Sequence, residues 1–145
     1  MPAKSSQAGS GGFSAAERAA MKQRAAELRA EGKKADELQA VLDAIAKMTP
    51  EDRAVAEGVH ATVTAAAPGL SPRTWYGMPA YANADGKVVV TFKNSGKFGT
   101  RYSTLEFQDA ANLDDGELWP VSFAMHAWSP AVEQKVAELM KAAVS

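Results

Sequence analysis

The sequence predicts an α+β domain in which helices pack on one face of an antiparallel sheet of four or five strands. Two observations lead to this fold class. Between residues 14 and 68 the apolar residues recur with helical spacing, whereas after Pro72 they alternate with polar residues as in a strand. A last helical pattern follows Ser129. The expected order is therefore three helices, four or five strands and one helix.

The composition limits the function classes before any motif is considered. The chain has 145 residues, 46% hydrophobic and 23% charged, which is typical of one globular domain. It contains no cysteine, which excludes disulfides, thiolate metal ligands and a thiol nucleophile. The formal net charge of -1 means that a nucleic acid would require a local basic patch. No signal sequence or membrane span is evident, so we expect a cytoplasmic protein with no membrane partner.

The first third of the chain predicts a tail followed by helices. Residues 1–12 are small, polar and glycine-rich, which is typical of a disordered tail. Ser14 and Glu17 form an S-x-x-E capping box, and the alanine-rich run after them predicts a helical extension over residues 13–32 with Gly32 as its C-terminal cap. The main domain is expected to span residues 36–145.

Two more helices are expected to carry the core. The first, over residues 36–47, has the helical stripe Leu38, Val41, Leu42 and Ile45. Thr49 and Pro50 are suited to the N-cap and first position of the next helix, which Pro68 ends. Its predicted inner stripe is Val55, Val59, Thr62, Val63 and Ala66.

The sheet is predicted from turn residues between short β-rich runs. We expect turns at Asp85-Gly86 and at residues 94–96, with a strand over residues 87–93 between them. Further strands are expected over residues 104–107 and 120–125. The last helix begins at Ser129-Pro130 and has the apolar stripe Val132, Val136, Leu139, Met140 and Ala143.

The expected hairpin register separates aromatic from basic side chains. It pairs Phe92 with Phe98, Val90 with Thr100, and Val88 with Tyr102, all facing the core. The basic residues then share the outer face: Lys87, Lys93, Lys97 and Arg101. Four cations on one face are suited to phosphates or an acidic partner, but base stacking needs exposed rings on the same face. Nucleic acid is therefore disfavoured as a partner.

The stretch T-W-Y-G-M-P-A-Y, residues 74–81, is expected to form one strand next to this hairpin. The predicted register turns Trp75, Gly77, Pro79 and Tyr81 inward, with Gly77 opposite Phe92 to make room for its ring. Tyr76 and Met78 then face outward. Together with Trp119 they are candidates for an aromatic rim that contacts a partner.

In this region the chain resembles the YdhG-like family of small bacterial proteins, domain of unknown function 1801. The motifs that carry the resemblance are Y-G-M-P-A-Y, a D-G-K turn, G-K-V-V-V-T-F and K-F-G-T-R-Y. It extends from about Asp36 to the end of the chain and implies a compact YdhG-like or frataxin-like sandwich of helices and sheet. The helix over residues 13–32 and N-L-D-D-G-E-L-W-P are similar to an actinobacterial-type subgroup. Because some members are labelled frataxin-like iron chaperones, the resemblance implies weak binding and carriage of iron.

Exposed carboxylates are the groups that such iron carriage needs, since iron as a hard cation accepts oxygen ligands. The candidate ligands are Asp36, Glu37 and Asp43 in the second predicted helix, and Asp114, Asp115 and Glu117 in the loop before Trp119. The pattern of the second group favours an ordinary polar turn over a cation site, because runs of charge are usually solvated surface. Glu57 and His60 form an E-x-x-H pair, but a di-iron site needs a second such pair, and the only other histidine, His126, has none.

No catalytic motif is present, and the function hypotheses are therefore binding functions. The first is a cytosolic, non-enzymatic protein that carries iron weakly. The alternative is a small-molecule-binding or protein-binding module that uses the aromatic rim and the basic strand face.

Overall fold

The computed structural model describes residues 12–145, so the predicted tail lies outside the described residues except for Gly12. The chain divides into two compact units, residues 1–35 and 36–145. Within the described residues, no helix has the length and apolar character needed to cross a membrane. The sites discussed below all belong to the second unit.

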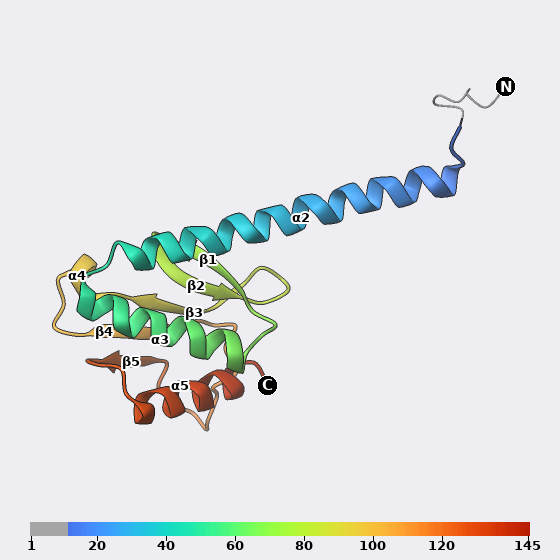
Figure 1. Ribbon diagram of the computed structural model, residues 1–145. Coiled ribbons are helices and arrows are strands. Elements are labelled where there is room, and N and C mark those ends of the chain that lie inside the picture. The colour runs from blue at the N-terminus through green and yellow to red at the C-terminus, as the bar shows by residue number, and fades with distance from the viewer. Residues whose placement is uncertain (1–11) are drawn as a thin grey trace. The chain divides into compact units, whose positions relative to one another are not determined.

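One helix, α2 (Ala15–Ala46), replaces the two that the sequence predicts (Figure 1). The capping box forms as expected: the Glu17 amide donates to Ser14 Oγ at 3.1 Å, and the Ser14 amide donates to Glu17 Oε1 at 2.8 Å. The prediction that Gly32 ends the helix is wrong. A glycine in a helix costs about 1 kcal/mol, which the good helix formers on both sides outweigh, and no proline follows before Pro50.

Two further helices of the second unit begin where the sequence predicts. Thr49 caps α3 (Pro50–Ala66), where its Oγ1 accepts from the Asp52 amide at 3.3 Å, and Ser129 caps α5 (Pro130–Ala143) in the same way. The predicted stripes of α3 and α5 face the core. In residues 36–46 of α2, Val41 and Ile45 are buried, whereas Leu38 and Leu42 are 37% and 40% exposed. That stripe is therefore narrower than predicted.

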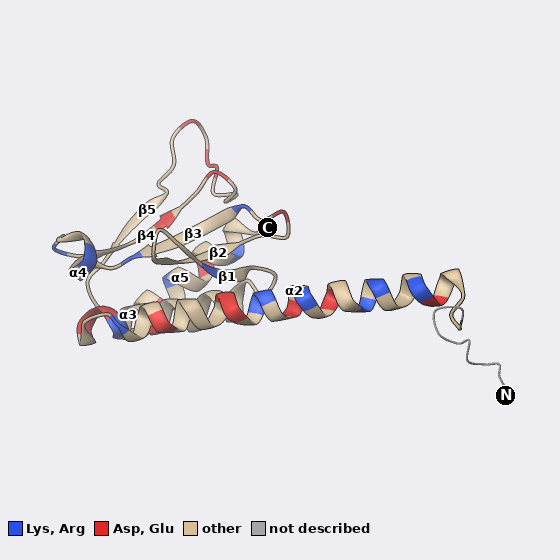
Figure 2. Cartoon of the chain, turned by 90° about the horizontal axis from the view of Figure 1, so that it is seen from above, with Lys and Arg blue, Asp and Glu red and all other residues tan. Residues whose placement is uncertain are grey.

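The sheet has five antiparallel strands in chain order, which confirms the α+β fold class. The strands are β1 (Ser71–Trp75), β2 (Met78–Ala82), β3 (Val88–Lys93), β4 (Ser103–Phe107) and β5 (Ser122–Met125). The helices of this unit cover one face of the sheet, and the loop between β4 and β5 extends on the opposite side (Figures 1 and 2). The core lies between the sheet and the helices.

The observed register differs from the predicted one. Tyr81 pairs with Val90 rather than Val88, and Phe92 pairs with Leu105 rather than Phe98. Tyr81, Val90 and Phe92 are still buried in the core, as predicted. The register shifts because β2 has an irregularity between Tyr81 and Ala82, and because the chain needs more residues than a tight turn to pass from β3 to β4.

That longer connection holds a short helix, α4 (Ser95–Phe98), where the sequence predicts a turn. Asp52 of α3 fixes its first residues. Ser95 Oγ donates to Asp52 Oδ1 at 2.8 Å, and the Gly96 amide donates to Asp52 Oδ2 at 2.8 Å. As a result Phe98 and Tyr102 leave the core, and each is 38% exposed.

The stretch over residues 74–81 is a hairpin rather than one strand. Trp75 ends β1 and pairs with Met78, so Tyr76 and Gly77 form a two-residue turn with φ values of 52° and 77°. Positive φ at both positions is typical of a type I′ turn, which suits the twist of the two strands. Gly77 is thus required by the turn, and not by the Phe92 ring. Trp75 is 37% exposed, so its predicted inward position is wrong.

Candidate functional site

The hairpin turn displays two aromatic side chains at one end of the sheet. Tyr76 is 79% exposed and Trp75 37%, and their ring centroids lie 5.2 Å apart. Tyr76 occupies the left-handed region, where glycine or asparagine is usual and a bulky residue is strained. Backbone strain at a residue whose ring is exposed indicates a role other than folding.

Lys97 of α4 connects the short helix to this turn. Its Nζ donates to the Tyr76 carbonyl oxygen at 2.8 Å. A Cβ on Gly77 would collide with the same Nζ, so any larger residue would require the end of the lysine side chain to move. Gly77 therefore meets two demands, the positive φ and the close approach of Lys97.

Cations and exposed rings occur together around α4. Lys93 Nζ lies 4.9 Å and Lys97 Nζ 5.5 Å from the centroid of the Phe98 ring, while the Arg101 guanidinium lies 5.2 Å from that of Tyr102. These distances are typical of cation–π pairs. The predicted separation of charge from aromatic rings is therefore wrong. We call this group the aromatic–basic surface; it comprises Trp75, Tyr76, Lys93, Lys97, Phe98, Arg101 and Tyr102.

The aromatic–basic surface has three cations and no carboxylate of its own, although the chain has a net charge of -1 and the Asp52 carboxylate contacts α4. The sequence contains no acidic residue between Asp85 and Glu106. Within the described part of the chain, none of Lys93, Lys97 and Arg101 forms an ion pair with a carboxylate. The three cations thus keep their charge available to a ligand.

Lys87 does not belong to this group. It precedes β3, beside the Asp85-Gly86 turn, where its amide donates to Asn83 Oδ1 at 3.0 Å. Lys93 ends the same strand, six residues later. The prediction that all four cations share one hairpin face is therefore wrong, because α4 replaces the expected strand partner.

The pairing of the strands places part of the aromatic–basic surface on the face of the sheet that is opposite the helices. Arg73, Ala80, Thr91 and Glu106 pair in one row across four strands, and Trp75 lies two residues from Arg73 on the same face. Lys93 likewise lies two residues from Thr91. Thr91 is fully buried, yet its Oγ1 has no hydrogen-bond partner among the described residues.

Asp52 supports α4 from the protein interior. Its side chain is only 6% exposed and accepts hydrogen bonds from α4 and, at 3.4 Å, from Ser103. Burial acts to raise the pKa of Asp52, but the bonds from Gly96, Ser95, Asn94 and Ser103 outweigh it, so the pKa lies below its usual value. Asp52 therefore stays ionised and holds α4, with Lys97 and Phe98, in place. The sequence suggests Asp52 only as a first-turn residue of α3.

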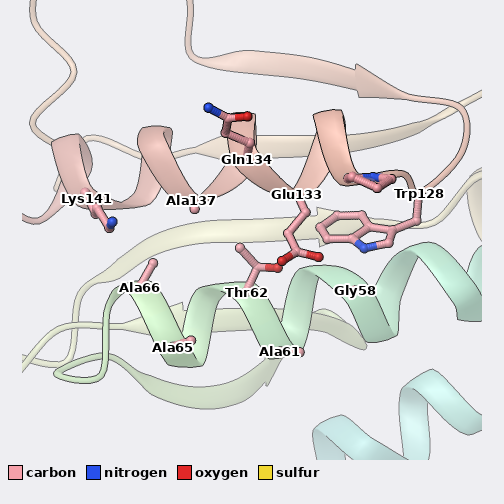
Figure 3. A pocket seen from close by; sticks show the side chains of 11 residues that line it. Gly58, Ala61, Thr62, Ala65, Ala66, Trp128, Glu133, Gln134, Ala137 and Lys141 are labelled. Carbon is pink, nitrogen blue, oxygen red and sulfur yellow. The ribbon is translucent and has the colours of Figure 1, made fainter.

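Apart from the aromatic–basic surface, the structure has a groove between α3 and α5, with a volume of about 460 Å³. The Trp128 indole covers Gly58, where a Cβ would overlap the ring. Figure 3 shows the Glu133 side chain extending from α5 toward Thr62 and Trp128. Small residues of α3 make the groove shallow, and its one aromatic side chain already contacts the protein. The groove is explained by helix packing.

The two residues of the E-x-x-H pair lie in different surroundings, and only His60 contacts the core. His60 Nδ1 lies 2.8 Å from the hydroxyl of Tyr81, and the two ring centroids lie 5.8 Å apart. Burial lowers the pKa of His60 and raises that of Tyr81. A neutral imidazole whose Nδ1 accepts a hydrogen bond from the Tyr81 hydroxyl satisfies both groups, which is a structural role. Glu57 is exposed on the same helix.

The predicted iron ligands lie in two separate elements. Asp36, Glu37 and Asp43 are in α2, and Asp114, Asp115 and Glu117 are in the loop between β4 and β5. Among residues 12–145, no group of three or more histidine, aspartate or glutamate side chains is arranged to hold a metal ion. The geometry therefore gives no independent support to a metal site.

The predicted aromatic rim is not one surface. Met78 is only 8% exposed. Trp119 is half-buried beside Phe107 at the end of β4, whereas Lys93 and Tyr76 lie near the opposite end of that strand. Of the three rim residues, only Tyr76 is freely displayed next to cations.

Comparison with known proteins gives no relative from which a function follows. No family model, no curated protein and no solved structure matches this chain. The functional argument therefore depends on the chemistry of the aromatic–basic surface.

Proposed function

We propose that this protein is a binding protein that recognises a polyanionic partner through the aromatic–basic surface. The observation that carries the proposal is Lys97: its ammonium group lies between the Tyr76 carbonyl and the Phe98 ring, at 2.8 Å and 5.5 Å, with no carboxylate partner among the described residues. The position of this cation is fixed before any ligand arrives. A preorganised cation loses less conformational entropy when it binds an anion.

The neighbouring groups support the same function. Lys93 and Arg101 lie against aromatic rings, which limits their freedom without neutralising their charge. The buried carboxylate of Asp52 fixes the backbone that carries them. Three positive side chains on a rigid support are suited to successive anionic groups of one polymer.

Membership of the YdhG-like family and weak carriage of iron remain predictions from the resemblance. Their direct test is titration with ferrous iron under anaerobic conditions, followed by NMR. Paramagnetic broadening of amide signals at Asp36–Asp43 or Asp114–Glu117 is the result that iron carriage requires. An unchanged spectrum at millimolar iron would contradict it.

The polyanion function is tested with heparin as the probe. We compare the wild type with a variant that carries Lys93→Gln, Lys97→Gln and Arg101→Gln, and we measure affinity at several salt concentrations. Each lost contact should lower the slope of log Kd against log salt by about 1. Lys87→Gln, which removes one charge outside the surface, is the matched control and should leave the slope unchanged. The proposal fails if heparin binds the triple variant as tightly as the wild type.

A further inference from the structure

We infer that the polyanion is a single-stranded nucleic acid whose bases stack on the exposed rings of the aromatic–basic surface. The inference rests on the proposed function and adds the identity of the polymer. Cations alone would bind any polyanion, so the argument depends on the rings.

Tyr76 is the ring best placed for stacking. It is 79% exposed, more than any other aromatic residue in the described part of the chain, and it lies in a turn. Asparagine or glycine at this position would relieve the strain of a φ of 52°. An acidic peptide or an inorganic polyphosphate has no planar group that would use such a ring, whereas every nucleic-acid base has one.

Rings and cations alternate along the surface. Tyr76 is followed by Lys97 at its carbonyl, then by the Phe98 ring, and then by Lys93 over that ring. A single strand presents the same alternation of planar bases and phosphates. Aromatic side chains that hold bases, together with cations along the backbone, are the usual means of binding single strands without sequence preference.

The geometry also favours a single strand over a duplex. Bases in a duplex are paired and stacked, so their faces cannot contact Tyr76 or Trp75. The aromatic–basic surface is formed by a hairpin turn and the four-residue helix α4, and neither has the length of a recognition helix that enters the major groove. Duplex DNA would have access only to the cations.

Calorimetric titration of the full chain with four probes tests the inference: oligo(dT), oligo(U), duplex DNA and inorganic polyphosphate at equal salt. The single-stranded oligonucleotides should bind more tightly than the other two probes, and their ratio distinguishes a DNA from an RNA ligand. Tyr76→Asn removes the ring and is compatible with the turn. It should weaken binding of the oligonucleotides by roughly 5- to 150-fold and leave polyphosphate binding unchanged. Tyr76→Phe should retain the affinity of the wild type.

The results separate failure of this inference from failure of the proposed function. If Tyr76→Asn weakens the binding of no probe, or if duplex DNA or polyphosphate binds as tightly as oligo(dT), the polymer is not recognised through its bases and the inference is wrong, although polyanion binding stands. If the wild type binds none of the probes, the proposed function is wrong as well. A thermal melt of Tyr76→Asn at or above that of the wild type confirms that lost binding does not come from unfolding.

Discussion

Lys97 Nζ donates a hydrogen bond to the carbonyl oxygen of Tyr76 at 2.8 Å, between residues that are 21 positions apart in the chain. This contact joins the β1–β2 turn to α4, whose Phe98 ring lies 5.5 Å from the same Lys97 Nζ. The two segments form one surface because of it. The predictions below test this arrangement and the packing that supports it.

The stability of the protein should be more sensitive to substitution of Gly77, in the β1–β2 turn, than to substitution of Gly86, in the β2–β3 turn. Gly77→Ala places a Cβ against Lys97 Nζ at a φ of 77°, whereas Gly86→Ala meets a φ of 81° with no atom within 4 Å. Both substitutions have the cost of a left-handed residue, about 1–2 kcal/mol. Gly77→Ala must in addition displace Lys97, so its free energy of unfolding in urea should fall further. Equal losses in the two variants would mean that the Lys97 contact contributes nothing.

Asp52→Asn should release α4 and change the pH dependence of stability. The hydrogen bonds to Gly96 and Ser95 lower the pKa of Asp52 in the folded protein, so the folded state binds fewer protons than the unfolded state. The stabilisation is complete above the unfolded pKa of about 3.9 and is lost as the pH falls through the lower folded pKa. At neutral pH the variant should lose about 1–3 kcal/mol. Urea unfolding at pH 7 and at pH values below 4 measures both effects.

The control for Asp52 is Glu51→Gln, one residue earlier and exposed in the same first turn. It alters the charge at the start of α3 without touching α4. If Glu51→Gln and Asp52→Asn lose equal stability, the effect comes from the helix dipole, and Asp52 does not hold α4.

Tyr81→Phe should destabilise the core because it leaves His60 Nδ1 without its 2.8 Å partner. A lost hydrogen bond of this kind costs about 1 kcal/mol, and Tyr102→Phe, at an exposed ring, is the control. Burial lowers the pKa of His60, so the unfolded state binds the extra proton and stability declines as the pH falls below about 6.5. His60→Gln should remove this decline. Persistence of the decline in His60→Gln would assign it to another group.

Gly58→Ala should disturb the contact between α3 and α5. A Cβ at this position overlaps the Trp128 indole, which has to move, and overpacking of this kind costs about 1–3 kcal/mol. Gly32→Ala is a matched helix substitution with no atom within 4 Å, and it should stabilise the protein or leave it unchanged. Thermal unfolding compares the two. A stabilised Gly58→Ala variant would show that Trp128 packs elsewhere.

Local chemistry made much of the fold predictable from the sequence. Ser14, Thr49 and Ser129 mark helix starts because their side chains accept hydrogen bonds from the first amides of a helix, and Pro50 and Pro130 suit the first helical position. The alternation in β3 likewise predicts the buried Val90 and Phe92. The prediction that Gly32 ends the first helix failed because the sequence alone does not weigh one glycine against the helix formers beside it.

The candidate site was less predictable because long-range contacts create it. Residues 94–98 have the composition of a turn and become α4 only because Asp52, more than 40 positions earlier, accepts their hydrogen bonds. The Tyr76-Gly77 turn had one usable signal, a glycine between two β-rich runs, but tyrosine is not a usual turn residue.

The most direct test of the central claim is an NMR titration of the labelled protein with a heparin oligosaccharide. Polyanion recognition by the aromatic–basic surface predicts that the largest amide shifts fall on Tyr76, Gly77 and residues 93–102, and that they diminish in the triple variant at Lys93, Lys97 and Arg101. Shifts centred on Lys87, on the α3–α5 groove around Trp128, or on no residue would contradict the claim.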